Sequence, residues 1–321
     1  MKATHLTVAF LGFSILISPR LSSAAQSAPP PDVPALLQKL VASGEAQRGQ
    51  IMDQLHQIQD PNLIVPPVLA ALDTVDPQDA WKLLDVLAPF SHLARPEPLI
   101  RLARRYVHVP STIETQLATI GAPARTALLK AIADACTTWK PLPTKDLPSN
   151  DGPDGEVEDD PQAVRPQPFM EWAARTLASI SSSGLDDLIQ MLRSRDACRI
   201  NVARAGLISY VLNSQPPADP RIVRALSAAL NAPDPIVQAA AVQIVEPVIG
   251  YQYAKLTPGL TKSLFSILKT HPDAEIRSRA LSLLLQASGD TPKKAAEIAS
   301  HDPDGRVQDL AANFLEELSA R

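Results

Sequence analysis

Glycine and aromatic residues are scarce in this chain, whereas proline is abundant. The 321 residues include 12 glycines and 31 prolines, and phenylalanine, tryptophan and tyrosine together make up 4%. Proline interrupts sheets and marks helix ends, so this balance argues against a β-rich fold and favours helices separated by turns. Because aromatic side chains are few, leucine, alanine, isoleucine and valine must fill most of the core. The hydrophobic fraction of 45% is sufficient for one.

The sequence also lacks an excess of charge and the signatures of catalysis. Its formal net charge is −4, which gives no support for a nucleic-acid-binding surface. No glycine-rich phosphate loop and no nucleophile motif occurs, and the histidines are scattered without metal-ligand spacing. Residues 150–155 resemble the start of a calcium loop, but Gly152 and Pro161 stand where oxygen ligands are needed. We therefore predict no catalytic residue, no metal site and no cofactor.

A short pattern recurs about every 30 to 40 residues in the C-terminal half. An apolar residue is followed four positions later by a small residue, and three positions after that by another apolar residue. This spacing puts all three on one helix face, where the small residue lets a second helix approach. Repetition at this period predicts an all-α fold, an α-solenoid of stacked antiparallel helix pairs. The copies are Met170, Ala174 and Leu177; Val237, Ala241 and Ile244; Ile276, Ala280 and Leu283; Val307, Ala311 and Phe314; and, more loosely, Ile200, Arg204 and Leu207, where Ala203 and Ala205 flank the mismatched Arg204.

Three segments of this half resemble the HEAT repeat, especially the version in bacterial phycobilisome-lyase-like proteins. In each, an aspartate near a turn precedes apolar residues, a polar residue and alanine-rich spacing; the segments are 234–241, 273–281 and 304–312. The resemblance implies an α-solenoid of antiparallel helix pairs and carries no catalytic residue. It covers about 111–321 and reaches 33–110 only through helical periodicity.

The chain divides into segments of different regularity. Residues 1–25 have the basic start, short apolar run and small-residue cleavage site of a signal peptide. The apolar run of about 12 residues is shorter than the roughly 20 that cross a bilayer. We predict cleavage after Ala25 and a secreted or periplasmic protein; an uncleaved membrane anchor is the alternative. The further segments are a proline-rich leader at 26–32, degenerate helical repeats at 33–139, a disordered acidic and proline-rich insertion at 140–168, and regular repeats at 169–321.

The two cysteines, Cys136 and Cys198, fit an exported protein. Each is predicted near the end of the second helix of its repeat, so a disulfide could bridge neighbouring repeats across the insertion. Stacked repeats lie about 10 Å apart, whereas bonded cysteines need Cα atoms roughly 5.5 Å apart, so a local adjustment would be required. Two buried free thiols are the alternative.

Arginines and two tyrosines are the candidate partner-binding residues. Solenoids commonly bind acidic or extended partners with arginines along one face, but arginine stems also cover apolar flanks, and their charges pair with nearby carboxylates or with the acidic insertion. The tyrosines follow an irregular helix and either contact a partner or fill a gap. The candidates are Arg193, Arg195, Arg199, Arg204, Tyr251 and Tyr253, with a second arginine group at Arg101, Arg104 and Arg105.

These observations predict an exported, non-enzymatic HEAT-repeat scaffold that binds a protein or peptide. No nucleic acid and no membrane span in the mature chain is expected. Two alternatives stay open at this point. One is a lyase-like enzyme that attaches or isomerises a tetrapyrrole, by family analogy. The other is a nucleic-acid-binding solenoid of the alkylation-repair type, which would need a basic concave face and a cytoplasmic location.

Overall fold

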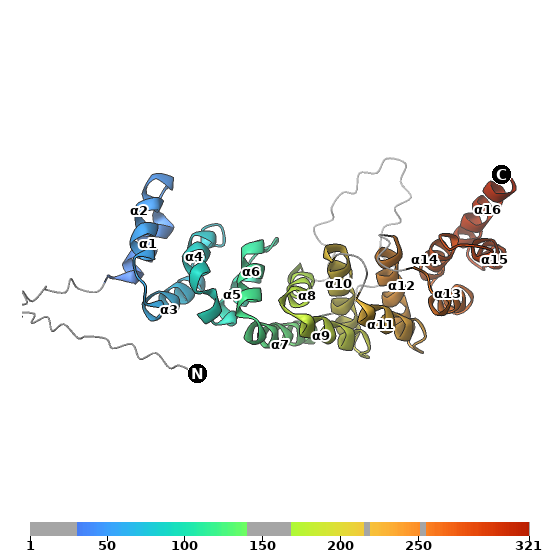
Figure 1. Cartoon of the computed structure of the whole chain (residues 1–321), viewed down its shortest axis with the longest axis horizontal. Helices are drawn as coiled ribbons and strands as arrows, with labels where there is room; N and C mark the ends of the chain where they lie inside the picture. Colours follow the sequence, from blue (N-terminus) through green and yellow to red (C-terminus); the bar gives the residue numbers. More distant parts are fainter. Residues whose placement is uncertain (1–30, 140–167, 215–218, 251–254, 321) are drawn as a thin grey trace, which may run out of the picture. The chain divides into compact units, whose positions relative to one another are not determined.

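The fold is entirely helical in the part of the chain that the structure describes. This is a computed structural model, and it describes residues 31–139, 168–214, 219–250 and 255–320. By internal contacts the chain divides into two units, Met1–Asp32 and Val33–Arg321, and every helix in Figure 1 belongs to the second unit. No helix within the described ranges has the length and apolar character needed to cross a membrane. The signal-peptide prediction and most of the insertion lie outside these ranges.

The helices form two layers in which, in most cases, a helix packs against the next but one along the chain. One layer contains the odd-numbered helices and the other the even-numbered ones, and most consecutive helices pack across the layers. This is the α-solenoid arrangement. The odd helices are α1 (Val33–Ala42), α3 (Pro61–Leu72), α5 (Pro96–Ala103), α7 (Ala122–Thr138), α9 (Ser182–Leu192), α11 (Pro220–Leu230), α13 (Pro258–Thr270) and α15 (Thr291–Ala299).

The even layer carries the recurring sequence motif. In α8, α12 and α14 all three motif residues are buried, so the motif faces the core as predicted. In α16 the last motif residue, Phe314, is only half-buried, because α16 packs only against α14 and α15 among the described helices. The even helices are α2 (Glu45–His56), α4 (Ala80–Leu87) with the 3₁₀ helix η1 (Ala88–Leu93), α6 (Ser111–Ile120), α8 (Pro168–Ile180), α10 (Ala197–Asn213), α12 (Pro235–Gly250), α14 (Ala274–Leu285) and α16 (Gly305–Ser319).

Helix α10 uses small residues other than the predicted one. Arg204, aligned with the motif alanine, is half-buried, whereas Ala203 is fully buried. A Cβ atom on Gly206 would lie 3.0 Å from the carbonyl oxygen of Ala174. The close approach of α10 to α8 therefore depends on Gly206. Pro168 is a second difference, because it begins α8 and does not end the insertion; proline suits the first turn of a helix, where its missing N–H is not needed.

The aspartates of the HEAT-like segments cap their helices, and a polar side chain four residues later closes the preceding turn. The carboxylates of Asp234, Asp273 and Asp304 accept hydrogen bonds from backbone N–H groups two residues ahead. The later side chains donate to the carbonyl group two residues before the aspartate. These bonds join Gln238 to Ala232 (2.8 Å), Arg277 to His271 (2.8 Å) and Gln308 to Asp302 (2.5 Å). The polar position of the motif thus holds the turn between paired helices.

Candidate functional site

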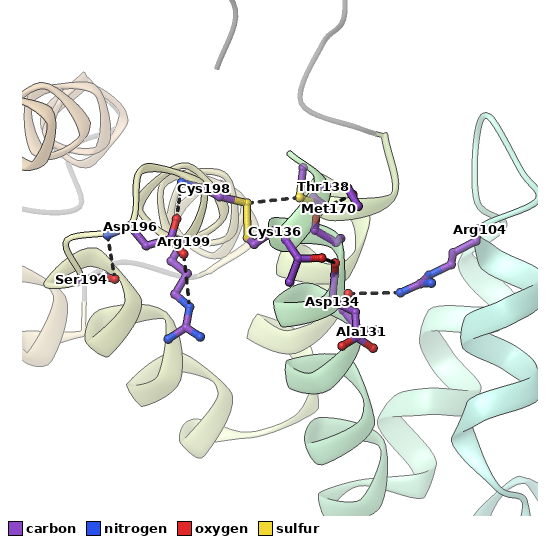
Figure 2. Close-up of a disulfide and its surroundings, with 12 residues drawn as sticks. Arg104, Ala131, Asp134, Cys136, Thr138, Met170, Ser194, Asp196, Cys198 and Arg199 are labelled. Carbon is purple, nitrogen blue, oxygen red and sulfur yellow. Dashed lines mark hydrogen bonds and ion pairs between the residues drawn. A yellow bond between two sulfur atoms is a disulfide. The ribbon is translucent and has the colours of Figure 1, made fainter. Parts of the chain in front are cut away.

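A disulfide joins Cys136 to Cys198, with their Cα atoms 5.6 Å apart (Figure 2). Cys136 lies in the last turn of α7, as the sequence indicates. Cys198 lies in the first turn of α10 and not near the end of a second helix. The end of α7 meets the start of α10, so the bond does not have to span the separation of two stacked repeats. Met170 Sδ of α8 lies 3.6 Å from Cys198 Sγ and packs beside the bond.

The disulfide crosses the joint at which odd-layer packing is weakest. Helices α7 and α9 make no substantial packing contact, unlike the other neighbouring helices of that layer. Instead, Arg125 of α7 forms a two-pronged ion pair with Asp187 of α9, at 2.5 and 2.7 Å. In the sequence, residues 140–167 lie between α7 and α8. The covalent bond and the ion pair therefore add to the packing of α6 and α7 on α8, which connects the repeats on the two sides of the insertion.

Three of the predicted partner-binding arginines surround the turn between α9 and α10. Arg193, Arg195 and Arg199 are all exposed. The Arg199 Nε atom lies 3.7 Å from Asp196, which also caps α10 (Figure 2). Within the described ranges, Arg193 and Arg195 form neither ion pairs nor side-chain hydrogen bonds. These three arginines are thus exposed around one turn, and Arg199 lies next to the disulfide-bonded Cys198 in the first turn of α10.

Arg204 does not belong to this group. Its side chain is half-buried in α10 and donates a hydrogen bond of 2.6 Å to Gln243 of α12. Burial lowers the pKa of the Arg204 guanidinium, and the nearby Glu171 carboxylate opposes that shift. Arg204 therefore joins two even-layer helices. Tyr251 and Tyr253 lie outside the described residues.

The second arginine group also makes internal contacts. Arg101 pairs with Asp73 of the preceding odd-layer segment at 2.8 Å. The sequence pattern places Arg101, Arg104 and Arg105 on one helix, but α5 ends at Ala103, so only Arg101 lies within it. The Arg104 guanidinium donates to the Ala131 carbonyl (3.2 Å) and covers the Phe169 ring, and Arg105 donates to the carbonyl of Leu72. These arginines connect α5 to its neighbours.

Ion pairs of this kind connect successive helices along both layers. The adjacent residues Asp186 and Asp187 of α9 face opposite neighbours, because Asp187 binds Arg125 of α7 and Asp186 binds Arg221 of α11. The most buried pair joins Arg277 of α14 to Asp302, before α16, through two contacts of 2.8 Å. Most arginines with described partners are therefore structural.

Two of the surface grooves have polar or charged linings that could bind a partner. The first, of about 640 Å³, lies where α6, α8 and α10 meet. Glu114 and Arg175 form an ion pair of 3.8 Å in its wall, and burial raises the pKa of the Glu114 carboxyl, an effect that Arg175 opposes. Tyr210 and several hydroxyl groups complete a polar lining that could hydrogen-bond an extended chain.

The second groove, of about 920 Å³, lies between α13 and α15 and is basic. Phe265, Leu256 and Ile298 are half-buried in it, and the Lys294 Nζ atom lies 5.8 Å from the centre of the Phe265 ring. The lining contains no carboxylate. The sequence reasoning above missed this site, although one signal was present: residues 247–272 contain no aspartate or glutamate. The lysines of the groove are Lys255, Lys262, Lys269 and Lys294.

The fold and these surfaces define a helical-repeat protein of the α-solenoid class. Among the described residues, no three histidine, cysteine, aspartate or glutamate side chains are grouped closely enough to hold a metal ion. No protein-family description and no curated protein matches the sequence. Among solved structures, a mutant form of Kap121p is similar, with a TM-score of 0.45 and 14% sequence identity. That match covers 87% of this chain and 31% of the other.

Proposed function

We propose that the protein is an exported, non-enzymatic scaffold of the HEAT type that binds another protein or a peptide in the grooves between its helices. The basic groove between α13 and α15 carries this proposal. Within the described ranges its lysines form no ion pair or side-chain hydrogen bond between repeats, whereas most arginines do. The groove also combines this charge with accessible apolar side chains. Charge around apolar anchors is typical of surfaces that bind proteins.

Two observations support export. Disulfides form and persist in secreted and periplasmic proteins and are rare in reducing compartments. This chain contains such a bond, between Cys136 and Cys198. The basic start, the apolar run and the small residues before Gln26 form a signal-peptide pattern.

Export and binding are tested separately. Export predicts that the tagged chain is recovered outside the cytoplasm, begins at Gln26 and has no free thiol without reductant. A cytoplasmic, uncleaved, reduced chain would contradict it. For binding, a photo-crosslinking residue replaces Thr261 in the basic groove, and a control replaces Asp134 on α7. We expect one defined crosslinked protein from the exported fraction with the groove variant. Identical products from both positions would refute groove binding.

The finer alternatives from the sequence have direct tests. A tetrapyrrole-attaching protein of the phycobilisome-lyase-like kind would purify with visible absorbance or transfer a pigment to a carrier. A nucleic-acid-binding solenoid would be retained on a phosphate column in a salt-dependent manner. The proposal predicts no pigment. Because a lysine-lined groove can itself be retained on phosphate, the proposal is distinguished from nucleic-acid binding by an oligonucleotide, which should not compete with the protein partner.

A further inference from the structure

The basic groove has a regular composition along both of its walls. On α13, Lys262, Phe265 and Lys269 follow one another at spacings of three and four residues, so they share one helix face. On α15, Thr291, Lys294 and Ile298 have the same spacing. The two helices pack against each other in the odd layer. Each wall therefore presents an apolar side chain beside at least one ammonium group.

The positive charge of the groove is not neutralised from within. Its four lysines make no ion pair with a described residue, and no carboxylate lines the groove. The neighbouring Lys293 differs, because it faces Glu297 on its own helix at 4.0 Å and lies outside the groove. Like charges in a concave surface reinforce one another and attract anions. The groove is thus suited to a ligand that supplies several negative charges.

The floor of the groove favours a peptide among anionic ligands. Phe265, Leu256 and Ile298 stay partly exposed between the lysines, and an apolar partner side chain would remove their remaining apolar surface from water, which is favourable. An anionic membrane offers a broad surface, which a concave site does not match. Nucleic acid is bound mainly through its phosphates and often through arginine forks, whereas this groove has lysines only.

We propose that the groove between α13 and α15 binds an acidic segment of a partner protein, with one or more apolar side chains of that segment seated on Phe265 and Ile298. This assignment rests on the proposed scaffold function and names the chemistry of the partner. The lysines contact the carboxylates on either side of the anchor, so affinity depends on salt. Binding requires both the charge and the anchor.

The test uses the purified full chain and a fluorescent 12-residue peptide with eight acidic residues around a central Leu-Phe pair. We expect binding that weakens at least tenfold in K262E/K269E and at least tenfold when the Leu-Phe pair is replaced by Ser-Gly. The control variant K39E/K130E makes the same charge change at two exposed lysines outside the groove and keeps wild-type affinity. Circular dichroism and the melting temperature show that each variant folds.

The opposing outcomes are distinct. Equal affinities of the wild type and K262E/K269E, or of the anchored and anchorless peptides, would overturn the assignment. So would stronger binding of a single-stranded oligonucleotide or of phosphatidylglycerol vesicles that is lost in the same variant. Binding of the peptide only after residues 141–167 are deleted would also overturn the assignment to a partner, because the groove would then be occupied by the chain's own acidic segment. If the peptide fails to bind but a partner is still crosslinked from Thr261 and not from Asp134, the proposed function stands and only the acidic chemistry of the partner is overturned.

Discussion

Removing the disulfide is the sharpest test of how the array holds together at the insertion. The bond joins residues separated by 62 positions in the sequence. In the chain-entropy relation, a crosslink closing a loop of this length lowers the entropy of the unfolded chain by about 14 cal/mol/K, or about 4 kcal/mol at 25 °C. We therefore expect the variant C136A/C198A to lose about 3 to 4 kcal/mol of stability. Reduction of the wild type is expected to have a similar effect.

The structure also predicts the form of the unfolding transition. Without the disulfide, α7 and α9 are connected mainly through the ion pair of Arg125 and Asp187, because their helices scarcely pack. Repeat arrays lose cooperativity at weak interfaces. Urea unfolding of the variant, followed by circular dichroism and by tryptophan fluorescence, is expected to separate into two transitions where the oxidised wild type shows one.

The variant C136A/C198A serves as the control, because reductant should not change its urea unfolding midpoint. Deleting residues 141–167 shortens the loop by nearly half, and the same relation then lowers the contribution of the bond by about 0.5 kcal/mol. The reasoning would be refuted if the oxidised and reduced wild type unfold at the same urea concentration. A disulfide contribution that rises after the deletion would refute the entropic explanation alone.

Three further predictions concern buried contacts. Arg277→Ala leaves the carboxylate of Asp302 buried without its partner, so we expect a loss of about 3 to 5 kcal/mol, measured by hydrogen exchange in α14 to α16. Arg277 holds the pKa of the Asp302 carboxyl below its ordinary value of about 3.9. The stability that this pair contributes is therefore fully present above that pH and is lost as the pH falls below it. Urea unfolding midpoints measured at a series of acidic pH values will show this loss. Gly184→Ala places a Cβ atom 1.9 Å from the Leu177 carbonyl oxygen and should cost about 1 to 3 kcal/mol or more of stability. Gly49→Ala has open space around the new Cβ atom and should stabilise α2 by about 0.5 to 1 kcal/mol. Thermal unfolding of the two variants compares these effects.

Each of these predictions has a matched control or a contradicting outcome. Arg101→Ala breaks an ion pair that is largely exposed, and we expect a loss of no more than about 1 kcal/mol. Equal losses at Arg101 and Arg277 would contradict the role given to burial. In the Arg277→Ala background the acid dependence below pH 4 should shrink. A Gly184→Ala protein as stable as wild type would show that α8 and α9 can move apart freely.

The helix faces and several turns could be predicted from the sequence, because each depends on residues within one or two turns of each other. The motif at Val237, Ala241 and Ile244 marks a buried face by its spacing alone. The capping aspartates Asp234 and Asp273 likewise act on backbone groups two residues ahead. Such contacts are short in sequence, so the pattern of residue types is enough to identify them.

The helix position of Cys198 was predicted wrongly from the sequence. The sequence places it near the end of a second helix, but the chain turns at residues 193–196 and Asp196 caps a new helix whose first turn contains Cys198. The capping aspartate two residues earlier was the available signal. The arginines failed for a different reason. Arg104 and Arg105 contact carbonyl groups about 30 residues away, which sequence spacing does not reveal.

The sequence by itself determined that this protein is a stack of helical repeats, since a period of about 30 to 40 residues with an alanine-centred face is a local property of each repeat. Only the tertiary structure decided which charges are used internally and which stay available. Asp186 and Asp187 are neighbours that bind arginines on opposite sides, and Lys262 and Lys294 meet across one groove although they lie on different helices. The physical reason is that such encounters depend on how one repeat packs on the next, and that packing is set by many side chains together.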